Sequence, residues 1–228
     1  MELQQQARRS AAGVRRPEHR TRARRPRPFT GGGPEGNEQL TASIGVILLV
    51  LLAVLGVTIL RIHQLISVHL FVSLLLIGPI GAKMASTGYR FVRYYTRDKA
   101  YLRKGPPAPA LRLLAPLVVL STVIVFASGV ALLFQGPSGR GTLLLIHKAS
   151  FVLWLIVTVV HVLGHLPGMP NHLRAVPRGP ESQGFSPGGA GRWIALIGPL
   201  VGGLVLAFVL IPDFASWTAA GAFHHGGH

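Results

Sequence analysis

Long apolar stretches alternate along this chain with polar segments that are rich in arginine. Each stretch is close to the roughly 20 residues that a helix needs to cross the hydrocarbon core of a bilayer. The pattern predicts an all-α fold, a polytopic bundle of transmembrane helices within residues 41–212. The five spans are expected at about 43–60, 65–86, 113–134, 143–166 and 193–211.

The composition supports a membrane protein. Hydrophobic residues make up 49% of the 228 positions and charged residues only 13%, which is about half the charged fraction of a soluble domain. The chain has no cysteine. Disulfides, thiolate metal sites, iron–sulfur clusters and covalent haem attachment through CxxCH are therefore excluded.

The two ends of the chain differ from its middle. Residues 1–40 are rich in Arg, Gln, Pro and Gly and have too few large apolar residues to form a core. We interpret them as a disordered, basic cytoplasmic tail that fixes the orientation of the chain. A basic tail can also bind anionic lipid or nucleic acid, but no nucleic-acid partner is expected, because the chain has no folded basic module. Residues 213–228, which end in AFHHGGH, are expected to form a flexible external tail.

The distribution of basic residues predicts the topology. Most of the 23 lysines and arginines lie in the N-terminal tail, between the second and third spans, or between the fourth and fifth. The opposite side has only Arg61 and Arg140 in its loops. Because loops rich in Lys and Arg stay in the cytoplasm, we expect a multi-pass protein of the cell membrane with its N-terminus cytoplasmic and its C-terminus external.

Two of the expected spans carry titratable residues at the same spacing. His69 and Lys83 are fourteen positions apart in the second span, and His147 and His161 are fourteen apart in the fourth. Fourteen residues return to nearly the same helix face about 21 Å further along the axis. An ionisable residue inside a span is energetically costly and indicates a function.

The order of the spans places these residues in two layers. The second and fourth spans run in the same direction, so that His69 and His147 lie at the same depth near the external face. Lys83 and His161 are expected to lie at the same depth near the cytoplasmic face. Two facing imidazoles between apolar helices are the arrangement that binds a b-type haem. Small residues in the other two spans (Gly45, Gly56, Ala115 and Gly129) match the two layers, although they also suit close helix packing.

The pattern resembles the di-haem b-type cytochromes built on a four-helix bundle, such as the membrane subunits of formate dehydrogenase and hydrogenase. In that family, two helices each carry two histidines about fourteen residues apart. The stretches ASTGYRFVRYYT and LLIHKASFVLW also resemble uncharacterised membrane proteins of actinobacteria. The resemblance implies a four-helix core plus a fifth span, with haem b as cofactor and His69, His147 and His161 as iron ligands. Lys83 departs from the pattern, because the family has a fourth histidine at that position.

Several residues have a second interpretation. His69 and His147 could form a polar contact between helices. Lys83 could ligate iron as a neutral amine or extend to the membrane interface. His165, four residues after His161, is either a reserve ligand for an inner haem or a partner for its propionates. Lys148 could neutralise a propionate or extend to the surface.

The expected function follows from what the spans contain and lack. No carboxylate lies within any span, which argues against paired-acid catalysis and against a buried acidic proton relay. The chain is expected to be an electron-transfer subunit, not itself catalytic, that binds at least one haem b near the external face. Its partners would be membrane lipid and a quinone or a redox protein. The alternatives are a cofactor-free membrane anchor or assembly protein and a component of a transporter.

The fifth span contains no ionisable residue. Gly198 and Gly202 are four residues apart and form a small-xxx-small pattern of the kind that packs helices together in lipid. We expect this span to be peripheral or to dock a partner.

Overall fold

A computed structural model describes residues 33–103, 105, 109–165 and 189–219. Its described part consists of α-helices, two short 3₁₀ turns and connecting turns. The helices are α2 (Gly33–Leu60), α3 (Ile62–Tyr95), α4 (Lys99–Arg103), α5 (Pro109–Gln135), α6 (Gly141–His165), α8 (Gly189–Val209) and α9 (Ala215–Thr218). The 3₁₀ turns are η1 (Pro137–Gly139) and η4 (Ile211–Phe214).

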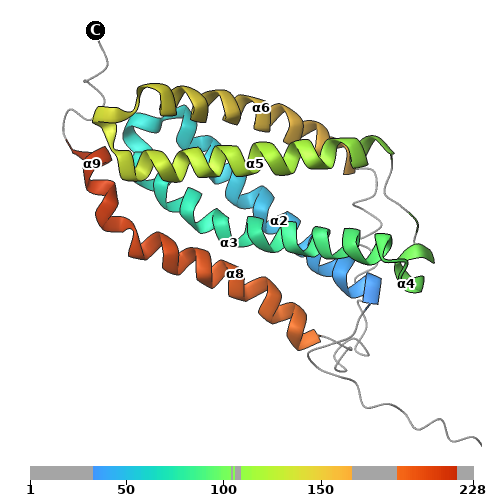
Figure 1. The fold of residues 1–228 in the computed structure, drawn as a ribbon. Helices are drawn as coiled ribbons and strands as arrows, with labels where there is room; N and C mark the ends of the chain where they lie inside the picture. The colour runs from blue at the N-terminus through green and yellow to red at the C-terminus, as the bar shows by residue number, and fades with distance from the viewer. Residues whose placement is uncertain (1–32, 104, 106–108, 166–188, 220–228) are drawn as a thin grey trace, which may run out of the picture.

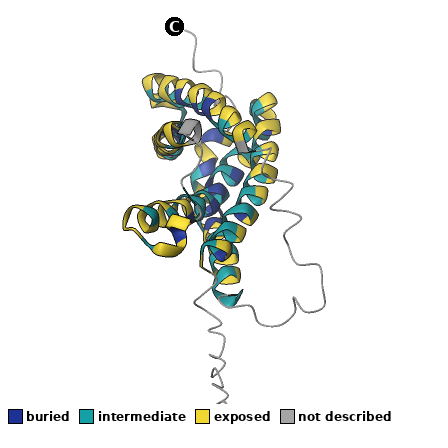
Figure 2. Ribbon diagram, turned by 90° about the vertical axis from the view of Figure 1, so that its right-hand side faces the viewer, coloured by how far each residue is buried: buried dark blue, intermediate teal, exposed yellow. Residues whose placement is uncertain are grey.

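Five helices of the described part are long and apolar enough to cross a membrane: α2, α3, α5, α6 and α8. Their outward faces expose large aliphatic side chains; Leu60, Leu113 and Ile156, for example, are 84%, 77% and 59% exposed. Figure 2 shows exposed positions on the outer faces of the helices and buried positions turned inward. Such surfaces suit contact with lipid. The all-α fold with five candidate spans is therefore confirmed.

The first helix begins about ten residues earlier than the sequence predicts. Residues 33–40, which we assigned to the basic tail, form the first turns of α2. Polar side chains of these turns and of the next residue pack against α3. Asn37 donates to the Ser86 carbonyl at 3.1 Å, and the Thr41 Oγ1 lies 2.9 Å from the Ser86 Oγ. Polar residues can therefore extend a helix when a neighbouring helix satisfies them. Residues 1–32 lie outside the described part.

The segment after α3 is also more ordered than a plain loop. α3 continues to Tyr95, and Asp98 then accepts hydrogen bonds from backbone N–H groups of the first turn of α4. Arg93 forms a 2.5 Å ion pair with Asp98 and lies 5.9 Å from the ring centres of both Tyr89 and Tyr101. These contacts fix α4 against the end of α3.

The long helices form two hairpins and one added helix (Figure 1). α2 pairs with α3, α5 pairs with α6, and α8 packs along α3, whereas contacts between α3 and α5 are sparser. The two hairpins therefore approach each other without close backbone contact along their length. The space between them contains the cavity described below.

α3 and α8 meet through glycine. A Cβ on Gly78 would overlap the Pro199 carbonyl, and a Cβ on Gly203 would overlap the Leu75 carbonyl. Pro79 has no N–H to bond the Leu75 carbonyl within α3, and this carbonyl lies against Gly203 instead. The packing face of α8 thus contains Gly203 and the fully buried Ala207.

The glycine pair that the sequence suggested lies on another face of α8. Cβ atoms on Gly198 and Gly202 would meet no neighbour within 4 Å. The contact with α3 uses Gly203 and Ala207, which have the same four-residue spacing. Both patterns fit the sequence, and only the position of α3 distinguishes them.

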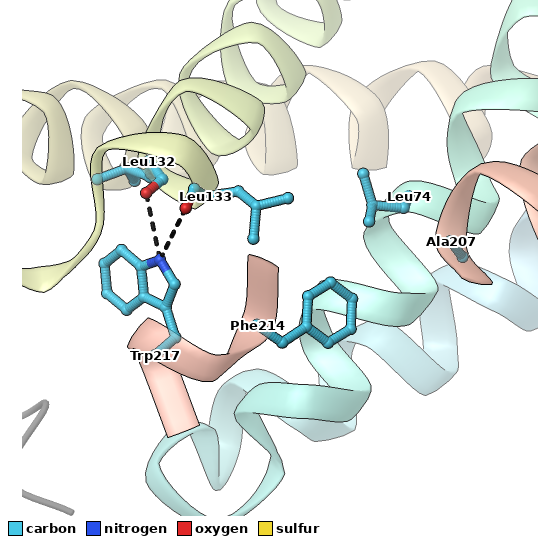
Figure 3. Close-up of a cluster of buried hydrophobic side chains, with 6 residues drawn as sticks. All are labelled: Leu74, Leu132, Leu133, Ala207, Phe214 and Trp217. Atoms are coloured by element: carbon cyan, nitrogen blue, oxygen red, sulfur yellow. Dashed lines mark hydrogen bonds between the residues drawn. The ribbon is translucent and has the colours of Figure 1, made fainter. Parts of the chain in front are cut away.

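The chain after α8 folds back onto the bundle. Phe214 and Trp217 are each 6% exposed and pack with Leu74, Leu132 and Leu133 (Figure 3). The Trp217 indole Nε1–H donates to the carbonyls of Leu132 and Leu133, at 3.2 Å and 3.4 Å. The last carbonyls of a helix lack partners within it, so Trp217 caps α5. Residues 213–218 are therefore helical and packed, in contrast to the flexible tail that we expected. The histidines of AFHHGGH lie outside the described residues.

Candidate functional site

A cavity of about 400 Å³ lies between the two hairpins. All four helices α2, α3, α5 and α6 contribute to its wall, and Trp217 of α9 also lines it. Most of the lining side chains are aliphatic or aromatic, and no Asp or Glu is among them. His69 from α3 and His147 from α6 both line this one cavity. The equal depth that the sequence predicted for them therefore corresponds to a shared space.

His69 is held by a hydroxyl of the neighbouring helix. Its Nδ1 lies 2.9 Å from the Thr58 Oγ1. The Thr58 hydroxyl donates its own proton to the Leu55 carbonyl at 2.6 Å. With the hydroxyl proton directed at Leu55, its oxygen is the acceptor for the ring, which favours the tautomer with the proton on Nδ1 and the lone pair on Nε2.

His147 is held in the same way within the other hairpin. Its Nδ1 lies 3.1 Å from the Val125 carbonyl oxygen and 3.1 Å from the Ser128 Oγ. The Ser128 hydroxyl donates to Val125 as well, at 3.0 Å. Because a carbonyl oxygen can only accept, Nδ1 of His147 is again the protonated nitrogen. Its Nε2 keeps the lone pair.

The contacts therefore favour the same tautomer in both rings, and each ring is held through its Nδ1. A histidine that binds a metal through Nε2 commonly donates Nδ1–H to a carbonyl, hydroxyl or carboxylate behind it, which fixes the ring and raises its basicity. Within the described residues, no three His, Cys, Asp or Glu side chains gather to hold a bare metal ion. An iron already held by four porphyrin nitrogens needs only two axial ligands.

The small residues have more specific roles than the sequence suggested. A Cβ on Gly129 would lie 3.1 Å from Cε1 of His147, so this glycine makes room for the imidazole itself. Gly45 faces Lys83, because a Cβ there would lie 3.3 Å from its Nζ. Gly56 has no neighbour within 4 Å and does not line the cavity. The residue of α2 that reaches the cavity histidine is Thr58.

Two aromatic rings of α6 form part of the cavity wall. Phe151 and Trp154 are stacked, with ring centres 6.1 Å apart and planes inclined by 28°. The Trp154 Nε1–H donates to the Thr122 hydroxyl at 2.9 Å, which ties α6 to α5. With its polar atom satisfied, the indole offers the cavity an apolar surface.

Lys83 and His161, which the sequence predicted at one depth, do not share a cavity as His69 and His147 do. Lys83 Nζ donates to the Thr41 carbonyl at 2.7 Å, so it turns toward α2 and connects the two helices of its own hairpin. Lys83 and His161 do not line the cavity. The lysine is therefore placed as a packing residue, and His161 is a half-buried residue further along α6. The side chain of His165 lies outside the described residues.

Sequence reasoning found the histidines but missed Thr58 and Ser128. Both are hydroxyl residues in otherwise apolar spans, and both are buried, with 2% and 5% exposure. A hydroxyl inside a span needs a partner on its own or a neighbouring helix. Aligning the two antiparallel helices of each hairpin would have identified these residues, because each contacts a histidine of the neighbouring helix.

No protein-family model matches this chain, and neither does any curated protein sequence or solved structure.

Proposed function

We propose that this chain is a membrane-bound b-type cytochrome subunit that binds one haem b between His69 and His147. One observation supports this most strongly. Two histidines from different hairpins line the same apolar cavity, and each has Nδ1 anchored behind it so that Nε2 keeps the lone pair for iron.

The cavity suits a largely apolar ligand, because most of its lining side chains are aliphatic or aromatic. Its volume of about 400 Å³ lies within the usual range for small-molecule sites. A bound haem supplies a one-electron carrier. The side chains of this protein hold it, orient the two imidazoles and exclude water from the iron. None of them needs to exchange a proton or form a bond during electron transfer.

The electron would come from a reduced quinol or redox protein and leave to an oxidised partner. In the orientation expected from the basic residues, the N-terminus is cytoplasmic and the cavity lies near the external face of the cell membrane. His69 and His147 lie six to seven residues after the starts of α3 and α6, which is about 10 Å along a helix. This depth is short enough for a partner at that surface to approach the ligand.

The direct test is the visible spectrum of the purified full chain, produced in a host that makes haem. We expect a sharp Soret band, a reduced α-band typical of two histidine ligands, and about one haem per chain by pyridine haemochrome assay. A protein that stays colourless and gains no Soret band when haem is added would contradict the proposal. It would then fit the cofactor-free anchor.

A second prediction concerns Thr58 of α2, whose hydroxyl contacts the ring of His69. Replacing Thr58 by valine keeps the shape of the side chain but removes the acceptor for His69 Nδ1–H. A less basic imidazole stabilises ferric iron less, so the midpoint potential should rise, by tens of millivolts for one hydrogen bond of about 1 kcal/mol. Spectroelectrochemical titration measures this rise. Thr58→Ser retains a hydroxyl and should stay near the wild-type potential, and an unchanged potential in Thr58→Val would show that this bond does not tune the ligand.

A further inference from the structure

A strongly basic segment lies at the end of the bundle away from the cavity histidines. Residues 87–112 include the last turns of α3, all of α4 and the first turn of α5, and they contain seven lysines and arginines but one acid, Asp98. That acid is paired with Arg93. The cationic surface of this segment consists of three exposed side chains, Arg97, Lys99 and Arg103. None of the three has an acidic partner in the part of the chain that the structure describes.

Arg97 occupies a backbone position that favours glycine. Its φ is 61°, and it is the only residue other than glycine with a positive φ among the described residues. It ends α3 in a Schellman motif, in which the Arg97 N–H bonds the Tyr94 carbonyl and the next N–H bonds the Arg93 carbonyl, both at 3.1 Å. A side chain is strained in this conformation. An arginine held there therefore indicates that its side chain has a use.

Aromatic side chains place the cationic surface at the depth of lipid headgroups. Tyr89, Phe91 and Tyr95 on the last turns of α3 are each more than half exposed. α3 has 34 residues, which span about 50 Å, whereas the hydrocarbon core is about 30 Å thick. The end of α3 therefore extends beyond the hydrocarbon. Exposed tyrosine and other aromatic rings at such a position are typical of the membrane–water interface.

The segment that carries these cations is folded. α4 lies against the end of α3 (Figure 1), where Tyr101 is buried and its ring meets that of Tyr89 edge to face, with centres 6.1 Å apart. Arg112 of α5 donates to the Tyr95 hydroxyl and lies over the same ring. The first turn of α5 is thus joined to the end of α3. These contacts hold the cationic surface in a defined shape before any partner binds.

An anionic phospholipid matches this combination of side chains. Arginine and lysine form strong, charge-assisted hydrogen bonds with phosphate oxygens. The exposed rings bring the lipid into contact with the same turns of α3, so that its phosphate lies within reach of the cations. The topology expected from the basic residues places this end in the cytoplasmic leaflet, where anionic lipids attract basic segments next to a span. An acidic soluble protein would match the charges but not the exposed rings.

We infer that the end of α3 and α4 form a binding site for an anionic phospholipid, in which Arg97, Lys99 and Arg103 hold the headgroup phosphate. The bound lipid offsets the backbone strain at Arg97. The site is independent of the proposed cofactor, and it makes the protein selective for the lipids that surround one end of its bundle.

The test titrates the full chain in a neutral detergent with phosphatidylglycerol or phosphatidylcholine and follows the first bound lipid by native mass spectrometry. The wild type should bind phosphatidylglycerol more tightly. Arg97→Gly should weaken phosphatidylglycerol binding by up to roughly fivefold, the contribution of one basic residue near a headgroup. Lys99→Gln and Arg103→Gln combined with Arg97→Gly should weaken it further, and phosphatidylcholine binding should not change. Because glycine relieves the strain, Arg97→Gly should not lower the unfolding temperature in the same detergent.

Arg61→Gln is the matched control, because Arg61 is an exposed arginine at the opposite end of α3. It should keep the wild-type lipid preference. The basic N-terminal tail is present in every variant, so a difference between variants reports the cationic surface alone. Equal binding of the two lipids by the wild type, unchanged phosphatidylglycerol binding in the triple variant, or an equal loss in Arg61→Gln and Arg97→Gly would overturn the inference. The second of these outcomes is the one expected if the surface serves an acidic protein.

Discussion

Replacing His69 or His147 by alanine should abolish stable haem binding. Under the proposed function, each change removes one of the two iron ligands and leaves an apolar gap in its place. Loss of a residue that merely supports a metal ligand costs about 10–100-fold in affinity, and loss of the ligand itself should cost at least as much. The purified variants should therefore lose the low-spin Soret and α-bands and contain little haem by pyridine haemochrome assay.

His161→Ala is the matched control for these variants. His161 lies on the same helix as His147 and within the same span, but it does not line the cavity. This variant should keep the haem content and the spectrum of the wild type. Size-exclusion profiles of all three variants check that the fold is retained. Normal haem content and an unchanged spectrum in either cavity variant would reject the ligand assignment.

The sequence predicted the parts of the site that depend on local periodicity. The alternating direction of the spans and the position of each histidine near an external end predict one depth for His69 and His147, and the structure has both on one cavity. Lys83 satisfies the same periodicity but turns to the Thr41 carbonyl of α2. Periodicity gives a helix face, and only the neighbouring helix decides what a long, flexible side chain on that face contacts.

The same limit explains the remaining differences in the fold. The start of α2 was placed too late because Asn37 and Thr41 are polar, and their partner Ser86 lies more than 40 positions away. The packing of Trp217 on the end of α5 also joins segments about 85 residues apart. Such pairings are properties of the assembled bundle. Hydropathy along the chain predicts which segments are helical spans, but it does not give their contacts.

Substitution of Gly203 by leucine should separate α8 from α3. Even a Cβ at this position would overlap the Leu75 carbonyl, and the opposing Gly78 has the same relation to the Pro199 carbonyl. Both obstacles are backbone atoms, which cannot move aside as a flexible side chain does. Overpacking of a core usually costs about 1–3 kcal/mol, and a larger loss is expected where two backbones are forced apart. Gly203→Leu and Gly78→Leu should therefore lower the unfolding temperature markedly in detergent.

A matched control for the glycine variants lies one residue away on the same helix. Gly202→Ala adds a methyl group where no neighbour lies within 4 Å, so it should leave the unfolding temperature unchanged or raise it slightly through better helix propensity. The loss of stability in Gly203→Leu should also weaken the packing around the cavity, because α8 leads into α9 and positions Trp217 on the end of α5. Faster release of haem from this variant to a competing haem-binding protein would measure that coupling. If Gly203→Leu and Gly202→Ala unfolded at the same temperature, the glycine contact between α3 and α8 would not be a determinant of the fold. α8 would then be a peripheral helix, as its uniformly apolar sequence first suggested.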